Sequence, residues 1–173
     1  MKKCFFYSVV LVAVALLSAC GPNRDKLQAE IADSEKALTT LQYELDTVAA
    51  RQLLKDYLRF VDHFPADTMS PVYLLKSASL LLGIGDPDQA VAVFDRIIDQ
   101  YPQYEDLPLC YVFKGKALEE SQRTEEAVVV YEAFLKNYPD HFLAHDISTV
   151  LPLVRQGMDE QQQLEYLLSH DEN

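Results

Sequence analysis

Apolar positions recur with the spacing of a one-sided α-helix in three separate segments of the chain: 49–65, 86–102 and 123–139. The spacing is i, i+4, i+7 and i+8, and in the first segment it is occupied by Leu53, Tyr57, Phe60 and Val61. Side chains so spaced lie on one face of a helix, so each segment is predicted to be a helix that buries a single stripe. Each segment ends in an aromatic residue followed by proline, which disfavours helical backbone at the residue before it. The pattern therefore predicts a helix end at each aromatic–proline pair.

The three segments are copies of one unit. Their closing prolines are Pro65, Pro102 and Pro139, and each lies 37 residues from the next. A fixed period of about 20 to 50 residues indicates stacked repeats. A second apolar segment of helical length precedes two of the blocks, at 71–82 and 108–120. Each unit is thus predicted to be two helices joined by a short turn, which must stack on its neighbours to bury its apolar face.

These units resemble the tetratricopeptide repeat (TPR) family. The resemblance is carried by Gly85, Asp86, Ala90 and Phe94 in one unit and by Gly115, Ala127 and Tyr131 in the next. Leu74 and Tyr111 depart from the family's tryptophan, and Ala78 departs from its first-helix glycine. The resemblance implies an all-α fold, a TPR-type α-solenoid with a leader helix before the repeats and capping helices after them. The longer, aromatic–proline form is most similar to BamD-like envelope lipoproteins of Gram-negative bacteria, the Bacteroidetes among them.

The start of the chain resembles a lipoprotein signal. Lys2 and Lys3 precede an apolar run at 5–17, and Leu17-Ser18-Ala19-Cys20 follows it. This order of basic, apolar and small residues is typical of a cleaved secretory signal. Its resemblance to a bacterial lipobox implies that Cys20 is acylated and becomes the first residue of the mature chain. An ordinary signal peptide and an uncleaved anchor remain the alternatives.

The chain divides into five predicted parts. They are a signal peptide at 1–19, a lipidated cysteine and tether at 20–26, a leader helix at 27–45, repeats at 46–157 and a capping helix with a tail at 158–173. The apolar stripe predicted for the leader consists of Leu27, Ile31, Leu38, Leu41, Leu45 and Val48. Two interpretations of this stripe are open: a helix that covers the first repeat, with a break at Thr39-Thr40 and an N-cap at Asp46, or a short coiled coil between copies. Pro152 is predicted to kink or split a helix near the end, and Asp159 to open the last one.

Composition argues against several function classes. The chain has 15 lysines and arginines against 27 aspartates and glutamates, a formal net charge of −12. So acidic a chain is a poor partner for nucleic acid. Cys110 is the one thiol expected to stay free, and we expect it to be buried and inert. His141 and His145 lie four residues apart, but no further residue completes a zinc-like ligand set. We therefore expect no catalytic residue, metal, cofactor or small-molecule substrate, with a metal-binding or enzymatic role for the two histidines as a minor alternative.

The family resemblance implies where a protein partner would bind. In TPR solenoids the first helices of successive units line the concave face, which here nominates Val72, Leu75, Ser79, Leu82, Leu109, Val112, Lys116 and Glu119. Leu75 and Ser79 do not fit a site for a free C-terminal carboxylate, so an extended or helical segment of a partner is the better candidate. The alternative is that a neighbouring helix or the leader covers these apolar side chains.

Together these features predict a non-enzymatic scaffold anchored by Cys20 to the outer membrane and facing the periplasm. Gly21, rather than aspartate, follows Cys20, which resembles outer-membrane sorting of lipoproteins. The most similar role is that of an accessory lipoprotein in a β-barrel assembly complex. The alternative is a coordinator of peptidoglycan or cell division that self-associates through its leader helix.

Overall fold

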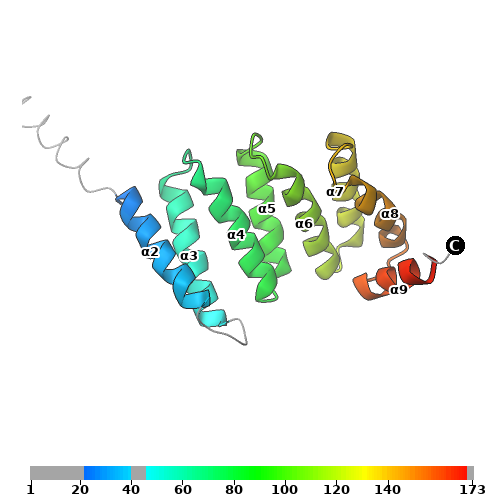
Figure 1. Ribbon diagram of the computed structural model, residues 1–173, viewed down its shortest axis with the longest axis horizontal. Coiled ribbons are helices and arrows are strands. Elements are labelled where there is room, and N and C mark those ends of the chain that lie inside the picture. Colours follow the sequence, from blue (N-terminus) through cyan, green and yellow to red (C-terminus); the bar gives the residue numbers. More distant parts are fainter. Residues whose placement is uncertain (1–21, 40–45, 171–173) are drawn as a thin grey trace, which may run out of the picture.

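The computed structural model describes residues 22–39 and 46–170, which form eight α-helices arranged in a row (Figure 1). The signal segment, Cys20, Leu41 and Leu45 lie outside the described residues. The helices are α2 (Arg24–Thr39), α3 (Thr47–His63), α4 (Met69–Gly83), α5 (Pro87–Gln100), α6 (Leu107–Glu120), α7 (Thr124–Asn137), α8 (Ala144–Arg155) and α9 (Glu160–His170). The all-helical solenoid predicted from the 37-residue period is confirmed.

The aromatic–proline pairs end the second helix of each unit, as predicted. Helix α3 stops at His63, and the backbone N–H of the capping residue Phe64 donates to Phe60 O. Tyr101 and Tyr138 cap α5 and α7 in the same way. Each proline then follows where the chain leaves the helix, because proline cannot donate the next backbone hydrogen bond. The ends of α3, α5 and α7 can therefore be predicted from the sequence alone.

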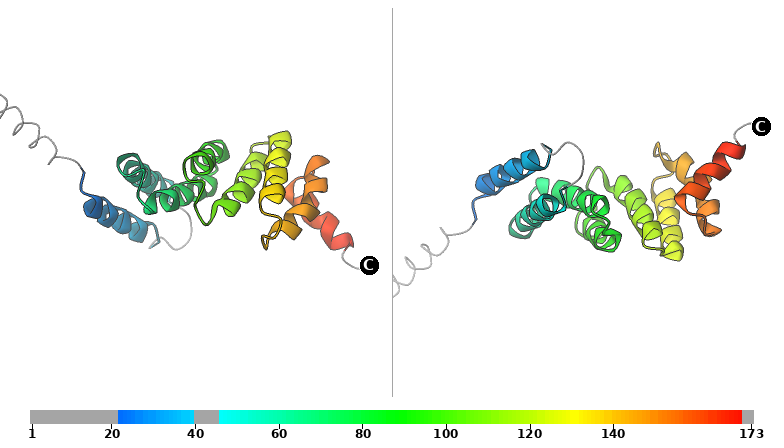
Figure 2. Two further views of the ribbon diagram at one scale, coloured as in Figure 1. Left: turned by 90° about the horizontal axis from the view of Figure 1, so that it is seen from above. Right: turned by 90° about the horizontal axis from the view of Figure 1, so that it is seen from below.

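Successive helices pack as antiparallel neighbours from α2 to α8, and the row twists when viewed from above and below (Figure 2). The apolar stripe that recurs in the second helices forms the core, with Phe60, Phe94 and Phe134 fully buried. Adjacent units are also joined at their loops, where the hydroxyl of Tyr101 donates to Pro65 O at 2.9 Å. The core is continuous along the row, so each unit depends on its neighbours for burial.

The leader helix begins earlier than predicted, and the last residues of the predicted 27–45 leader lie outside the described residues. Helix α2 begins at Arg24, inside the segment predicted as a tether, and Thr39 is its last residue. Val48 belongs to α3 and is 78% exposed, so the stripe predicted over 27–48 does not continue into it. The physical reason is the cap at Asp46, whose carboxylate accepts from the backbone N–H of Val48 at 2.8 Å and of Ala49 at 3.2 Å and so starts a new helix.

Helix α2 is built into the solenoid. Its apolar residues Leu27 and Ile31 are buried in the common core, and its neighbour is α3. Arg24 binds the Asp67 carboxylate at the α3–α4 loop through two hydrogen bonds of 2.5 and 3.1 Å. This arrangement favours the covering helix over the coiled coil, because Leu27 and Ile31 are already occupied within the chain.

The C-terminal helices also differ in part from the prediction. Helix α8 continues through Pro152 to Arg155, so of the two predicted outcomes the split is wrong, and the kink stays a prediction. Pro152 lies in the last turn, where loss of one backbone donor interrupts little of the helix. Gly157, with φ of +74°, then turns the chain, a conformation that glycine adopts without strain. Asp159 caps α9 by accepting from Gln162 N at 2.9 Å, as the sequence predicted.

Candidate partner-binding groove

An apolar groove lies where α2, α3 and α4 meet. Its cavity volume is about 610 Å³, and it is lined by Glu35, Leu38, Leu53, Tyr57, Leu75, Lys76, Ser79 and Leu80. Two of these residues, Leu75 and Ser79, were nominated from the sequence. The groove is open at the surface and is hydrophobic apart from its rim, which is the usual character of a site for a protein segment.

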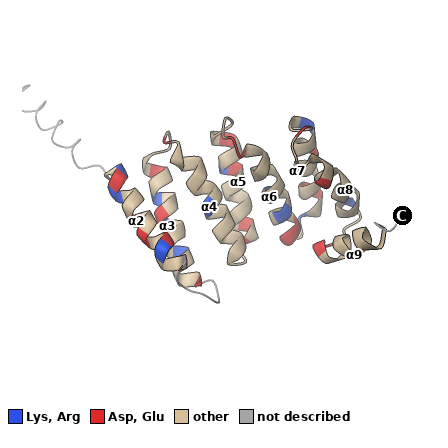
Figure 3. Ribbon diagram, in the orientation of Figure 1, with Lys and Arg blue, Asp and Glu red and all other residues tan. Residues whose placement is uncertain are grey.

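The composition of α4 explains the apolar surface. Lys76 is the single charged residue between Met69 and Gly83, and Figure 3 shows α4 with almost no charge along its length. Tyr73 and Leu74 are buried, while Leu75 stays half-buried on the groove side. The Ser79 hydroxyl donates to Leu75 O at 3.0 Å, so it already has a partner within the helix. What remains open to a ligand on this helix is therefore mainly hydrocarbon.

Three hydrogen-bonded side chains, two of them charged, form the rim of the groove. Glu35 Oε1 accepts from the Tyr57 hydroxyl at 2.6 Å and from Lys76 Nζ at 2.7 Å. Burial opposes ionisation of Glu35, but the hydrogen bonds from Lys76 and Tyr57 prevail and hold its pKa below its usual value. Burial and the hydrogen bond to Glu35 both raise the pKa of Tyr57. Glu35 is therefore ionised and Tyr57 protonated at neutral pH, and the three groups tie α2 to α3 and α4.

The sequence-nominated residues divide into three groups. Val72, Leu75, Leu82 and Leu109 are half-buried, and Ser79 and Lys116 are exposed. Val112 is only 4% exposed, so it cannot serve as a partner contact in this conformation. Glu119 is half-buried and accepts two internal hydrogen bonds, from Tyr131 and Gln163. The nomination is wrong for Val112 because α6, packed between α5 and α7, buries a wider face than one stripe.

Two exposed first-helix positions were missed. Lys76 lines the groove, and Phe113, 37 residues later, is partly exposed on α6. Each lies one residue beyond a nominated position, since Leu75 and Val112 are also 37 apart. Moving the nominated positions one residue along each first helix would have selected both Lys76 and Phe113.

A second carboxylate–tyrosine pair lies in the α6–α7 unit. The Tyr131 hydroxyl donates to Glu119 Oε1 at 2.6 Å, and burial together with this bond raises the pKa of Tyr131. The buried ring passes directly over Gly115. A Cβ atom at Gly115 would lie 2.3 Å from Tyr131 Cε1, which no real contact allows. Gly115 matches the first-helix glycine of the family, and this geometry shows why the position admits no side chain: the Tyr131 ring of α7 lies against it.

The three corresponding residues of the preceding unit are all different. The residues 37 positions before Gly115, Glu119 and Tyr131 are Ala78, Leu82 and Phe94. Where the ring lacks a hydroxyl, the carboxylate is replaced by leucine and the glycine by alanine. In the α6–α7 unit the glycine makes room for the tyrosine ring, and the glutamate accepts from its hydroxyl.

The described residues offer little else for chemistry. Among residues 22–39 and 46–170, no group of three or more His, Cys, Asp or Glu side chains could hold a metal ion. The His141 ring nitrogen Nδ1 accepts from the Leu143 backbone N–H at 3.3 Å. Cys110 is buried, and burial raises the pKa of its thiol to about 12, so it is not a nucleophile at neutral pH. No helix within the described ranges is both long and apolar enough to cross a membrane.

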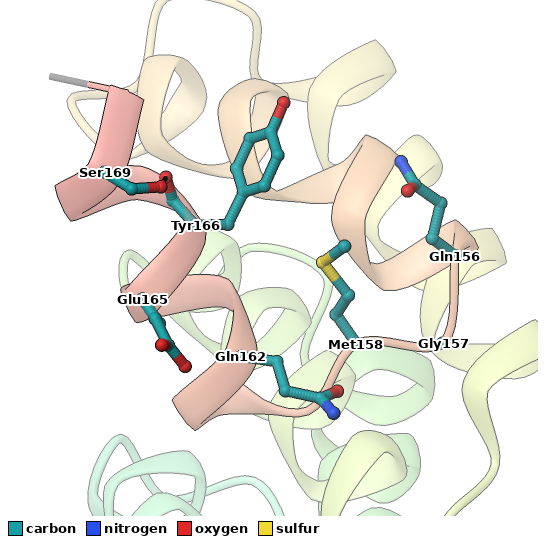
Figure 4. A pocket seen from close by; sticks show the side chains of 7 residues that line it. All are labelled: Gln156, Gly157, Met158, Gln162, Glu165, Tyr166 and Ser169. Carbon is teal, nitrogen blue, oxygen red and sulfur yellow. Dashed lines mark hydrogen bonds between the residues drawn. The ribbon is translucent and has the colours of Figure 1, made fainter.

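A second depression lies between the end of α8 and α9 (Figure 4). It is lined by Gln156, Gly157, Met158, Gln162, Glu165, Tyr166 and Ser169, most of which carry polar side chains. It offers less hydrocarbon surface than the groove at α4 and more polar surface. We therefore treat the groove between α2, α3 and α4 as the candidate binding site.

Comparison with known proteins agrees with the geometry. Residues 73–104 and 114–141 match the Tetratricopeptide repeat family, and these stretches cover parts of the helix pairs α4–α5 and α6–α7. No curated protein matches the chain. TPR units commonly present a surface for another protein rather than a catalytic site. The chain therefore contains two stretches similar to tetratricopeptide repeats, and such repeats support a scaffold for protein–protein interaction.

Proposed function

We propose that this protein is a lipid-anchored, non-enzymatic scaffold of the cell envelope that binds a partner protein in the groove between α2, α3 and α4. The observation that carries the proposal is the open hydrocarbon surface of Leu38, Leu75 and Leu80 on tetratricopeptide-type units. A groove of this kind fits an amphipathic helix or an extended segment that inserts a few apolar side chains.

The anchor is proposed from the sequence Leu17-Ser18-Ala19-Cys20. Helix α2 begins at Arg24, four residues after Cys20. Four extended residues span at most about 14 Å, so an acylated Cys20 would hold the first helices close to the bilayer. With Gly21 after the cysteine, the proposed location is the outer membrane, facing the periplasm. The proposed role is that of an accessory lipoprotein of an outer-membrane protein assembly complex in a Gram-negative bacterium.

The packing of α2 supports this role over self-association. Leu27 and Ile31 are buried within the solenoid and would have to leave it to form a coiled coil with another copy. Nothing in the described helices offers a compensating contact. The coordinator of peptidoglycan or cell division therefore has less support than the docking scaffold.

The lipid anchor is tested by metabolic labelling with an alkyne fatty acid. We expect the wild-type protein to be labelled and Cys20→Ala to carry no label, because acylation requires the thiol. Cys4→Ala is the matched control and should be labelled like the wild type. Equal labelling of the wild type and Cys20→Ala would contradict the anchor.

The groove is tested by capturing partners from gently solubilised envelopes with a tag after Asn173. Leu75→Asp places a charge in the hydrocarbon surface, and we expect it to reduce capture of the principal partner by about ten-fold or more. Val129→Asp is the control, since Val129 is exposed on α7, away from the groove. Equal capture by Leu75→Asp and Val129→Asp would show that the partner binds elsewhere.

A further inference from the structure

Helix α9 is held to the solenoid mainly by polar contacts. Gln163 is the buried residue of this helix, and its Nε2 donates to Glu119 Oε2 at 2.9 Å and to Met158 O at 2.8 Å. Beside it, Lys116 Nζ lies 3.6 Å from Glu160 Oε1. Helix α9 therefore meets the end of α6 through one buried amide and one exposed ion pair.

The repeat register makes this arrangement unexpected. Leu164 and Leu168 lie 37 residues after Ala127 and Tyr131, which pack into the core of the preceding unit. In α9, however, Leu164 is 57% exposed and Leu168 is 64% exposed. The buried residue of the helix is thus the polar Gln163, and of its three leucines Leu167 alone is half-buried.

The first unit contains a similar contact, made to a helix that is also packed into the core. There Glu35 accepts from Tyr57 and from Lys76 of α4, just as Glu119 accepts from Tyr131 and from Gln163 of α9. Helix α4 adds a large apolar anchor, since Tyr73, Leu74 and Leu81 are buried with it. Helix α9 has the polar contact without such an anchor.

We propose that α9 is a releasable latch, which the Gln163–Glu119 contact closes over the end of α6. In the closed state α9 engages Lys116 and Glu119, two residues that the family resemblance nominates for partner binding. Release frees the carboxylate of Glu119 for a hydrogen-bond donor of a partner, such as a lysine, arginine or amide side chain. This last step rests on the proposed scaffold function, whereas the latch itself does not.

Hydrogen exchange measured by mass spectrometry on the full chain tests the latch without any partner. In Gln163→Glu the new carboxylate would face the carboxylate of Glu119, and the two would repel each other. We expect the backbone amides of 160–170 to lose protection from exchange, while those of α3 to α7 keep theirs. Gln161→Glu adds the same charge to the same helix at an exposed position and should leave protection unchanged. Unchanged protection in Gln163→Glu, or equal loss in Gln161→Glu, would overturn the latch. Loss that spreads into α6 and α7 would also overturn it, because α9 would then be part of the core.

A swap of the two groups provides the rescue. In the double variant Glu119→Gln with Gln163→Glu, the new amide at 119 can donate to the carboxylate at 163 and still accept from Tyr131. We expect protection of 160–170 to return towards the wild-type level. Recovery is expected to be partial, because a carboxylate at 163 cannot donate to Met158 O as Gln163 does. A double variant no better protected than Gln163→Glu alone, with α6 and α7 still protected, would show that the 119–163 contact does not hold α9.

Whether α9 covers the end of α6 is tested by chemical labelling of lysine amines in the wild type and in Gln163→Glu. Release should raise the labelling of Lys116 in Gln163→Glu, while Lys114, which pairs with Asp95 of α5, keeps its wild-type labelling. Labelling of Lys116 that does not change on release would overturn the covering role. A latch that behaves as expected in a protein that captures no partner would contradict only the proposed scaffold function.

Discussion

Phe94→Ala is expected to lower the free energy of unfolding by about 3–5 kcal/mol. Phe94 lies at the centre of the middle unit and is fully buried. Phe94 lies on helix α5, which packs on both α4 and α6. The cavity left by the substitution would therefore weaken the packing of α5 on its two neighbouring helices. Domains of this size are stable by only about 5–15 kcal/mol, so the variant would lose a large fraction of its stability. Urea unfolding followed by far-ultraviolet circular dichroism measures the change.

An exposed phenylalanine provides the control. Phe142 is 76% exposed in the loop before α8, and Phe142→Ala should change stability by no more than about 0.5 kcal/mol. If both variants lost similar stability, the assignment of Phe94 to the core would be wrong, and with it the stacking of units in a 37-residue register.

Gly115→Ala is expected to destabilise the protein by about 1–3 kcal/mol, although alanine is the better helix former by about 1 kcal/mol. The new methyl group would lie 2.3 Å from Tyr131 Cε1 and 2.5 Å from Cζ. The ring cannot move aside easily, because it is buried and its hydroxyl is bound to Glu119. Steric overlap should therefore outweigh helix propensity, and thermal or urea unfolding would give the sign directly.

The middle unit suggests the rescue of this variant. Adding Glu119→Leu and Tyr131→Phe to Gly115→Ala copies the Ala78, Leu82 and Phe94 set of the preceding unit. We expect the triple variant to recover most of the lost stability in α6 and α7, because the ring is no longer held over the helix backbone. A triple variant less stable than Gly115→Ala alone would show that the three residues do not act as a unit.

Much of the fold could be predicted because the determinants are local and repeated. The aromatic–proline pairs, the cap at Asp46 and the apolar stripes each act within one helix, so their physics is visible in the sequence. Gly115 could be identified in the same way, because it matches the first-helix glycine of the tetratricopeptide repeat family. The structure agrees at these positions because local preference and tertiary packing favour the same conformation.

The remaining features depend on contacts between distant residues. Val112 was nominated as exposed, but packing between two neighbours widens the buried face of α6 beyond the stripe that periodicity defines. The docking of α9 could not be predicted either, because the register places Leu164 and Leu168 inward and the observed contact uses Gln163 instead. Half of the groove comes from α2 and α3, and no single-helix pattern shows that Leu38 and Leu75 line the same cavity.

The candidate site was found only in part for a related reason. Leu75 and Ser79 were nominated from the first-helix positions, and both line the groove. Glu35, Tyr57 and Lys76 form its charged rim from three different helices. The register alone shows that Glu119 and Tyr131 stand where the preceding unit has Leu82 and Phe94, and this difference could have indicated the polar contact between α6 and α7.

The most direct test of the central claim is site-specific photo-crosslinking in intact cells from position 79. Ser79 is exposed and lines the groove, so a photoreactive side chain there would touch whatever occupies it. We predict a crosslinked adduct with an envelope protein from position 79, and none from Asp99, which is exposed on α5 and does not line the groove. Absence of an adduct at position 79, or the same adduct from both positions, would contradict the claim that this groove is the partner-binding site.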